Sequence, residues 1–223
     1  MGDVNQLIFI KKYAEQLKGP YLEVGSKDYG STQDLRQLFA GGGKYIGIDA
    51  EDGPGVDIVL DITEDFNKID AKFNGQRFGT IFCLSVLEHC KNPFKMAENM
   101  THLLQEKGRI CISVPFSWKI HAYPSDYWRF TPEGVRCLFP KIEFEPEQAF
   151  AATSKKGEFH KIDNELGRIS FSLSVHWKRG HFLRGIFAKL HKLLSRLGIG
   201  LFAGYRHVMA PTNILMLGRL KDT

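Results

Sequence analysis

The sequence is poor in cysteine and has no long hydrophobic run. It contains 4 cysteines in 223 residues, and none of them forms a CxxC pair or a metal-ligand pattern with histidine. Cys83 and Cys111 lie in apolar segments, which favours buried, reduced thiols. No stretch is long enough to span a bilayer, and Lys11 and Lys12 follow a short apolar run rather than precede a long one. These absences predict a cytoplasmic protein without disulfides and without a bound metal.

Acidic residues are absent from most of the C-terminal quarter. Residues 166–220 contain no Asp or Glu, and residues 166–223 hold 10 Lys and Arg against 1 acidic residue. Residues 1–165 hold 20 Lys and Arg against 24 acidic residues, so the net charge of +5 comes from the C-terminal part. This change of composition marks a basic, partly helical insertion, which we place at residues 153–211.

Helix-like and strand-like segments alternate along the rest of the chain. The length suits one α/β domain, residues 1–223, in which helices cover both faces of a mostly parallel sheet. The expected strands are residues 21–24, 45–48, 56–60, 78–84, 109–114, 141–151 and 213–220. The expected helices are residues 5–17, 32–39 and 93–104, with a further helix that begins at Thr131-Pro132.

A glycine turn follows the first expected strand. Residues 22–30 read LEVGSKDYG, and an aspartate, Asp49, ends the second strand about 20 positions later, as in a nucleotide-type site. A dinucleotide turn needs a middle glycine so that the backbone can approach a pyrophosphate, but Lys27 occupies that position. Glu23 adds a carboxylate, which repels phosphates and suits an ammonium group. The turn therefore favours a phosphate-free adenosine cofactor with a cationic end, S-adenosyl-L-methionine (SAM).

These segments together resemble the class I SAM-dependent methyltransferases. Glu23-Val24-Gly25 matches the first motif of that family, and Asp49 matches the carboxylate that holds the ribose hydroxyls there. Residues 53–62 resemble the third-strand region, which lies against adenine, and residues 85–89 resemble the fourth-strand motif beside the transferable methyl group. The resemblance covers roughly residues 21–153 and 212–220. It implies a Rossmann-like, seven-stranded sheet whose last strand is antiparallel.

The turn and the resemblance together predict a set of residues that bind SAM. The predicted cofactor-binding residues are Glu23, Gly25, Ser26, Gly30, Asp49, Ala50, Asp61, Ile62, Leu84 and Ser85.

A loop rich in aromatic and charged residues follows the fifth strand. Residues 121–131 read HAYPSDYWRFT, and loops at the carboxyl ends of strands carry ligand-binding groups in open α/β sheets. We expect Tyr123, Tyr127 and Arg129 to bind the acceptor. The alternative is that the aromatic residues only pack the loop onto the sheet. The run DYWRFT resembles a signature of a bacterial methyltransferase branch that often accompanies genes for surface-polysaccharide or other glycan assembly.

Histidines near the expected methyl position are candidates for a general base. A hydroxyl acceptor must lose its proton, and a histidine or carboxylate within hydrogen-bond reach can take it. His121, oriented by Asp126, is the preferred pair, and His89 after the fourth strand is a third catalytic candidate. The alternative for His89 is that Glu88-His89 caps a helix or anchors a neighbouring loop.

The basic insertion contains a predicted amphipathic helix. Apolar residues recur at helical spacing over residues 183–197, with Lys and Arg on the other faces. Three interpretations stay open: a helix that covers the sheet or the active site, peripheral contact with an anionic membrane, and attraction of an acidic acceptor. Nucleic acid is not expected as a partner because no binding motif is present. The oligomeric state is left open.

The function predicted from these features is methylation by SAM of an oxygen on a sugar or related polar acceptor, in glycan or surface-polysaccharide biosynthesis. A phosphorylated or lipid-linked acceptor would place the protein at the inner face of the membrane. The alternatives are a methyltransferase for a small natural product and a non-catalytic SAM-binding partner protein. A NAD-dependent oxidoreductase is disfavoured by Lys27 and by the absence of a nearby Tyr-x-x-x-Lys pattern.

Overall fold

The computed structural model describes residues 4–30, 35–121, 125–163, 166, 173–178, 180–198 and 211–222. The chain divides into two compact units. Unit 1 consists of Met1–Ile162 and Pro211–Thr223, and unit 2 of Asp163–Ala210. The expected insertion at residues 153–211 contains unit 2, but its first residues belong to unit 1, where they form a short strand, Phe159–Lys161.

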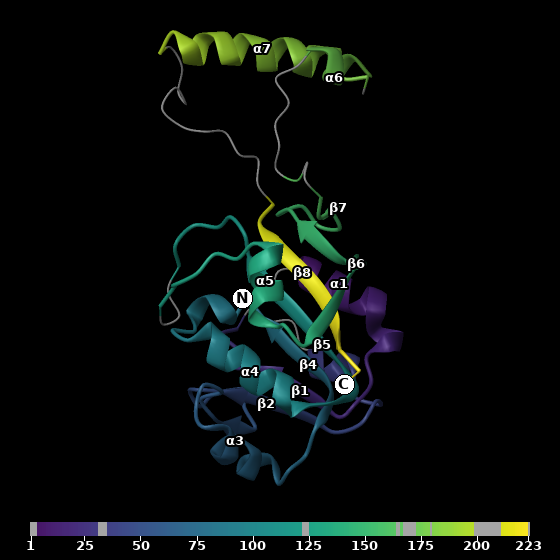
Figure 1. Ribbon diagram of the computed structural model, residues 1–223, viewed down its shortest axis with the longest axis vertical. Helices are drawn as coiled ribbons and strands as arrows, with labels where there is room; N and C mark the ends of the chain where they lie inside the picture. The colour runs from purple at the N-terminus through teal and green to yellow at the C-terminus, as the bar shows by residue number, and fades with distance from the viewer. Residues whose placement is uncertain are drawn as a thin grey trace. The chain divides into compact units, whose positions relative to one another are not determined.

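Unit 1 is built on a single sheet with the order β3-β2-β1-β4-β5-β8-β6-β7 (Figure 1). Strands β1 to β5 pair in parallel, whereas β8 is antiparallel to β5 and β6 on its two sides. The predicted mostly parallel sheet with an antiparallel last strand is therefore confirmed. The strands are β1 Tyr21–Val24, β2 Tyr45–Asp49, β3 Ile58–Val59, β4 Phe78–Leu84, β5 Leu104–Pro115, β6 Ile142–Ala152, β7 Phe159–Lys161 and β8 Asn213–Leu220.

The sheet has eight strands where seven are predicted. The additional strand, β7, pairs with the end of β6 at the sheet edge, and its three residues are too few to give a recognisable alternation in sequence. Strand β5 also begins earlier than predicted, directly after helix α4. The strand is irregular at Lys107, which has φ 59°.

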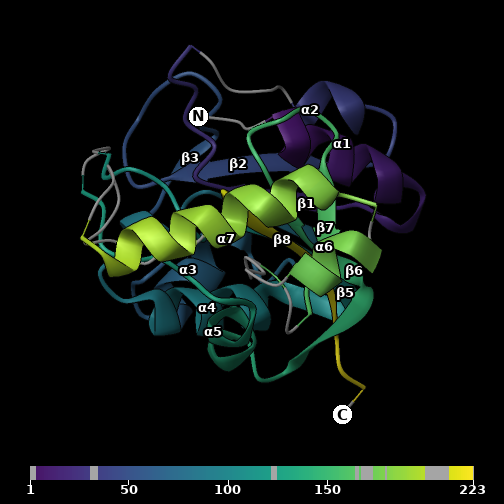
Figure 2. The ribbon, with the colours of Figure 1, turned by 90° about the horizontal axis from the view of Figure 1, so that it is seen from above.

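Helices cover both faces of this sheet (Figures 1 and 2). Helices α1 and α2 lie on one face, where Phe9, Ile10 and Leu35 join Tyr21 and Phe82 of the strands in a buried core. Helices α3, α4 and α5 lie on the other face. The helices are α1 Val4–Tyr13, η1 Ala14–Gln16, α2 Leu35–Leu38, α3 Phe66–Phe73, η2 Leu87–His89, α4 Pro93–Leu103 and α5 Pro132–Leu138.

The start of α5 confirms the predicted capping pattern. The Oγ1 atom of Thr131 accepts a hydrogen bond from Gly134 N at 3.0 Å, and Pro132 stands at the first helical position. The segment between the end of β5 and this cap is thereby fixed at both ends. It is the loop whose sequence suggests contact with an acceptor.

Unit 2 contains a pair of helices, α6 Leu173–Lys178 and α7 Phe182–Arg196. Gly180, with φ 71°, forms the turn between them, and His181 N donates a hydrogen bond to His176 O at 2.8 Å. Trp177 contacts Phe182 edge-to-face at 4.9 Å between ring centroids. Within the parts of the chain that the structure describes, none of the helices has both the length and the apolar character needed to cross a bilayer.

Candidate cofactor and acceptor site

A cavity of about 840 Å³ opens in unit 1 beyond the carboxyl ends of β1, β2, β4 and β5. Ligands bind in this position in open α/β sheets, because neighbouring strands end there and their loops diverge. The lining includes eight of the ten residues predicted to bind the cofactor. These are Glu23, Gly25, Asp49, Ala50, Asp61, Ile62, Leu84 and Ser85.

Ser26 and Gly30, the other two predicted residues, do not line the cavity. Ser26 is buried, and its side chain lies against β2, because a Cβ on Gly47 would stand 2.6 Å from Ser26 Oγ. Gly30 donates its N–H to Asp28 Oδ1 at 2.7 Å and has φ 84°, so it closes a turn stabilised by the aspartate. Both residues shape the glycine turn from outside the cavity.

Gly25 allows the turn to pass close to the segment after β4. It has φ 75°, and a Cβ at this position would lie 2.3 Å from Val86 Cγ2. A side chain here would therefore push apart the ends of two neighbouring strands. Glycine is required at this position by the approach of the two segments and by the backbone conformation.

Two carboxylates stand on either side of this turn. Glu23 Oε2 accepts a hydrogen bond from Tyr45 Oη at 2.7 Å. Asp49 is oriented by Glu51 N at 3.0 Å from Oδ1 and by Lys27 N at 3.3 Å from Oδ2. These contacts leave the two carboxylates on the wall of one cavity, where Glu23 suits a cationic group and Asp49 suits hydroxyl donors.

Lys27 does not face a phosphate site. Its Nζ lies 2.7 Å from Glu51 Oε2, and its side chain covers Gly53, where a Cβ would stand 3.0 Å from Lys27 Cε. The hydrogen bond to Glu51 raises the pKa of Lys27 above its usual value. The lysine in the turn is therefore paired with a carboxylate of the next loop, which agrees with a ligand that lacks a pyrophosphate.

A buried glutamine from the first helix completes the floor of the cavity. Gln6 Nε2 donates hydrogen bonds to Ser85 Oγ and Ser113 Oγ, each at 2.8 Å. Ser85 has φ 57°, an uncommon conformation for a residue with a side chain, and the glutamine holds its hydroxyl in place. No sequence pattern indicates this contact, because Gln6 stands in an ordinary amphipathic helix far from the motifs.

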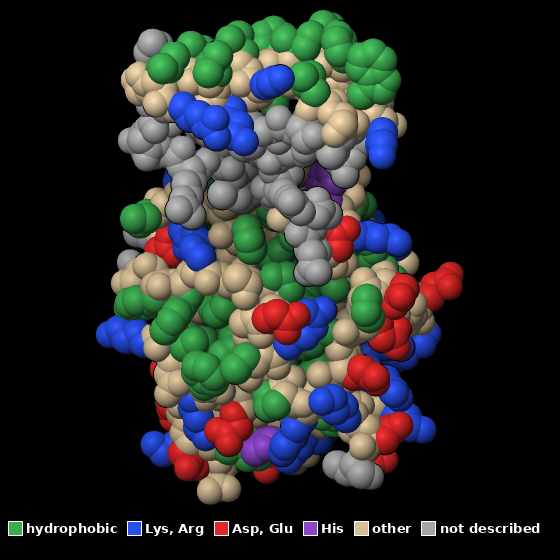
Figure 3. All heavy atoms as spheres, turned by 45° about the horizontal axis from the view of Figure 1, so that its top comes forward, with side chains coloured by type: hydrophobic (Ala, Val, Ile, Leu, Met, Phe, Trp, Pro, Cys, Tyr) green, Lys and Arg blue, Asp and Glu red, His purple; other side chains and the backbone are tan. Residues whose placement is uncertain are grey.

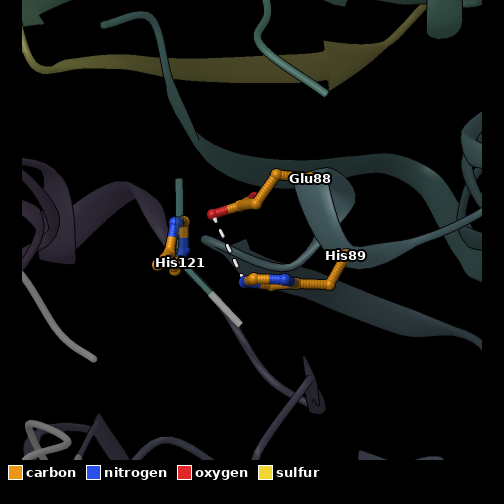
Figure 4. A group of neighbouring side chains, drawn as sticks. All are labelled: Glu88, His89 and His121. Carbon is orange, nitrogen blue, oxygen red and sulfur yellow. Dashed lines mark ion pairs between the residues drawn. The ribbon is translucent and has the colours of Figure 1, made fainter. Parts of the chain in front are cut away.

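Two histidines and a glutamate meet at the side of the cavity next to β4 (Figure 4). Glu88 and His89 belong to η2, and His121 belongs to the loop after β5. The two imidazole rings are 4.9 Å apart between centroids and nearly perpendicular, at 83°. His89 Nδ1 lies 2.6 Å from Ser125 O, and because a carbonyl oxygen only accepts, Nδ1 carries the proton and Nε2 the lone pair.

The predicted pair of His121 and Asp126 is present. Asp126 Oδ2 lies 3.1 Å from His121 Nδ1 and accepts a hydrogen bond from His121 N at 3.0 Å. Arg129 holds the same carboxylate through Nη1 at 2.5 Å and Nη2 at 2.7 Å. The guanidinium keeps the pKa of Asp126 well below its usual range. Two acceptors lie near Nδ1 of His121, Asp126 Oδ2 at 3.1 Å and Lys119 O at 3.4 Å, so in the neutral imidazole Nδ1 carries the proton and Nε2 the lone pair.

Glu88 is a buried carboxyl group at the centre of this cluster. Its side chain is 1% exposed, and Oε2 accepts no hydrogen bond from any residue that the structure describes. Burial raises the pKa of Glu88 to about 8. One ligand atom from each of Glu88, His89 and His121 lies within 4.8 Å of the others, so the group could hold a metal ion. The sequence shows no metal-ligand spacing because His121 comes from a separate loop.

The aromatic loop is anchored to the segment after β4. Tyr127 N donates to Glu88 O at 2.8 Å, and Trp128 Nε1 donates to Cys90 O at 2.8 Å. Tyr127 lines the cavity, whereas Phe130 is buried beneath the loop. Of the other predicted acceptor residues, Arg129 acts on Asp126 rather than on the cavity wall, and Tyr123 lies outside the described residues.

The comparisons with known proteins identify similar structures but no similar sequence. No protein-family model matches the chain, and no curated protein matches its sequence. Among solved structures, a SAM-dependent methyltransferase from Archaeoglobus fulgidus has a TM-score of 0.55 at 15% identity, covering 96% of this chain and 93% of its own. The 1,6-didemethyltoxoflavin-N1-methyltransferase of Burkholderia thailandensis, with S-adenosylhomocysteine bound, has a TM-score of 0.53 at 13% identity, covering 97% and 76%.

The chain therefore has the Rossmann-like α/β fold of these methyltransferases. The same fold also supports another reaction. The [4+2]-cyclase SpnF has a TM-score of 0.55 at 12% identity, covering 99% of this chain and 81% of its own. Because the fold is compatible with more than one reaction, the function has to be argued from the side chains of the site.

Proposed function

We propose that this protein is a SAM-dependent methyltransferase that methylates a hydroxyl group of a sugar or related polar acceptor in bacterial glycan or surface-polysaccharide biosynthesis. One observation carries the proposal. A single cavity holds the glycine turn with its two carboxylates, Glu23 and Asp49, and also the His121 side chain that Asp126 orients. The first group suits a phosphate-free nucleoside with a cationic end, and the second suits removal of a proton from an acceptor.

The lining residues fit SAM in charge and in polarity. Glu23 would hold the ammonium group, and Asp49 the ribose hydroxyls, because both are carboxylates on the wall of the cavity. Leu60 and Ile62 offer an apolar wall for adenine beside Asp61, whose Oδ1 is fixed by Thr63 N at 2.8 Å. When bound, SAM supplies an electrophilic methyl group on a positively charged sulfur.

His121 would accept the proton of the acceptor hydroxyl at Nε2. Asp126 stabilises the resulting imidazolium, and Arg129 keeps Asp126 ionised and in position. His89, whose Nδ1 proton is held by Ser125 O, presents its own Nε2 beside this position. The remaining contribution of the protein is to hold the hydroxyl oxygen in line with the methyl group, since orientation is a large part of such a displacement.

The acceptor side of the cavity supports a polar, ring-shaped substrate. Trp118 and Tyr127 line it and are partly exposed, so they offer flat surfaces next to the histidines. The DYWRFT run of this loop resembles a signature found beside glycan-assembly genes, which supports a sugar acceptor. A lipid-linked or phosphorylated form of that acceptor would place the reaction at the inner face of the membrane.

Two alternatives use the same cavity. The first is methylation of a small natural product. One of the similar structures, the 1,6-didemethyltoxoflavin-N1-methyltransferase, is named for such an activity of its own. The second is SAM binding without turnover. Glu88 and His89 adjoin the predicted methyl position, and a protein that had lost catalysis would not need the His121–Asp126–Arg129 arrangement.

The proposal is tested in two steps on the purified protein. Calorimetry with S-adenosylhomocysteine and with NAD comes first, and we expect binding of the former only. Methyl-labelled SAM is then incubated with a panel of free, nucleotide-linked and lipid-linked sugars, and the label is expected in the sugar. Binding of NAD instead of S-adenosylhomocysteine would exclude the cofactor assignment. Cofactor binding with transfer only to a non-sugar acceptor would contradict the substrate class.

A further inference from the structure

Helix α7 has an apolar face whose large side chains are exposed. At about 100° per residue, its large apolar side chains fall within an arc of about 140°, and its lysines and Arg196 fall outside that arc. Six of these side chains, Leu197 directly after the helix and Trp177 of α6 are between 42% and 70% exposed. They are Trp177, Phe182, Leu183, Ile186, Phe187, Leu190, Leu193 and Leu197.

The partner helix within unit 2 packs on a different side of α7. Gly185 lies outside the apolar arc, and a Cβ there would stand 2.9 Å from His176 Cβ, so α6 approaches α7 closely at this point. The contact between Trp177 and Phe182 extends the apolar row at its N-terminal end. Figure 3 shows this row of hydrophobic side chains along α7, at the top of the view, with Lys and Arg side chains beside it. Exposed apolar surface of this extent marks an interaction site.

The charge around this face has one sign. Lys178, Lys189, Lys192 and Arg196 are exposed on the two helices, and residues 166–220 contain no carboxylate that could neutralise them. Apolar residues in one arc and cations on the flanks match the cross-section of a lipid surface, in which acyl chains lie beneath anionic headgroups. A tryptophan at the edge of the row suits the boundary between these two layers.

We propose that the α6–α7 apolar face docks on an anionic membrane surface, with α7 parallel to the bilayer plane. Phe187, Leu190 and the other residues of the arc enter the acyl region, and the lysines contact the headgroups. The biological role of this docking rests on the proposed function, because a lipid-linked acceptor would be met at the same membrane surface. Docking itself requires neither SAM nor an acceptor. It can therefore be tested apart from turnover.

The test is co-sedimentation of the full-length protein with vesicles, without SAM or acceptor. We expect binding to vesicles that contain phosphatidylglycerol, weaker binding to pure phosphatidylcholine, and loss of binding as salt is raised. The variant F187D should reduce binding at least tenfold. Its matched control is F94D, the same change at an exposed phenylalanine of α4 in unit 1, and it should bind as the wild type does.

A second pair of variants tests the charges. K189Q with K192Q should weaken binding about fivefold per lysine, since a cation near an anionic surface contributes about 1 kcal/mol. K68Q with K72Q, on exposed helix α3, is the control and should have no effect. Circular dichroism of each variant checks that its helical content is unchanged.

The outcomes distinguish a membrane from a second copy of the chain as the partner of the α6–α7 apolar face. Absence of vesicle binding, or equal loss of binding in F187D and F94D, would overturn the proposal. So would a stable dimer that F187D converts to monomer without any binding of the wild type to vesicles, because a second copy would then cover the face. Failure of methyl transfer with intact vesicle binding would contradict the proposed function and leave the docking surface standing.

Discussion

The carboxylate of Asp126 contacts His121 and Arg129 at once. Its Oδ2 lies 3.1 Å from His121 Nδ1 and 2.7 Å from Arg129 Nη2. The arginine is therefore a partner of the aspartate, and in the proposed reaction it would act on the histidine through that carboxylate. Three residues of one eleven-residue loop form a unit that sets the tautomer of a single imidazole.

Removal of this imidazole should reduce turnover strongly. For H121A we expect kcat to fall by about 10² to 10⁴, the usual contribution of a general base, with the affinity for S-adenosylhomocysteine unchanged. D126N should lower kcat as well, because an amide does not stabilise the imidazolium. Single-turnover kinetics with the best acceptor measures both. H160A, at an exposed histidine of β7, is the control. Unchanged turnover in both H121A and H89A would exclude a histidine base.

The carboxylate after β2 should govern cofactor affinity. For D49N we expect binding of S-adenosylhomocysteine to weaken by about tenfold to a hundredfold, since hydrogen bonds to a charged group contribute about 1.5–3 kcal/mol. Calorimetry measures the change directly. E64Q, at an exposed position before α3, should bind as the wild type does. A wild-type affinity in D49N would show that the ribose is held elsewhere.

Glu88 should make the protein less stable as the pH rises. An exposed glutamate loses its proton near pH 4.3, whereas burial raises the pKa of Glu88 to about 8 in the folded protein. Between these values the folded state keeps a proton that the unfolded state releases, so the free energy of unfolding falls with increasing pH. The variant E88Q stays neutral and should be more stable than the wild type at pH 8, by about 4–5 kcal/mol from these two pKa values, and about equal at pH 4.

Thermal denaturation from pH 4 to pH 8 in the presence of a chelator measures this difference. The melting temperatures of E88Q and the wild type should diverge as the pH rises, and E64Q should follow the wild type. Parallel curves for E88Q and the wild type would mean that Glu88 ionises normally in the folded protein.

Chelation distinguishes a histidine base from a metal at the same cluster. In the proposed mechanism His121 acts as the base through Nε2 and no metal takes part, so we expect turnover to be unaffected by EDTA. Added Zn²⁺ should inhibit, since imidazole nitrogens are preferred zinc ligands and a bound ion would occupy that lone pair. Initial rates with and without chelator measure the effect. Loss of activity in EDTA, restored by a divalent cation, would assign Glu88, His89 and His121 to a catalytic metal site instead.

The sequence predicted the sheet and most of the cavity because both depend on local patterns. Apolar runs bounded by glycine, and carboxylates at strand ends, place Glu23, Asp49 and Asp61 at one edge of a parallel sheet. Contacts between segments that are far apart in the chain do not produce such a local sequence pattern. Gln6 reaches Ser85 across 79 positions, and Glu88 meets His121 only after the loop has folded back onto η2.

The glycine turn shows the same limit on a smaller scale. The sequence located the turn, and Gly25 lines the cavity as predicted. It could not show that Ser26 would face β2, because the direction of that side chain depends on the space left by Gly47. Tyr127 and Arg129 are a further case: both are predicted acceptor residues, and of these two only Tyr127 lines the cavity, because Arg129 is paired with Asp126.

The position of β8 in the sheet determines when the sheet of unit 1 can be completed during synthesis. This last strand lies between β5 and β6, so the interior of the sheet stays open until residues 213–220 have left the ribosome. All of unit 2 precedes this strand in the chain, so it is synthesised while unit 1 still lacks an inner strand. If the proposed docking surface forms early, a nascent chain could therefore meet a lipid surface before the sheet of unit 1 has closed.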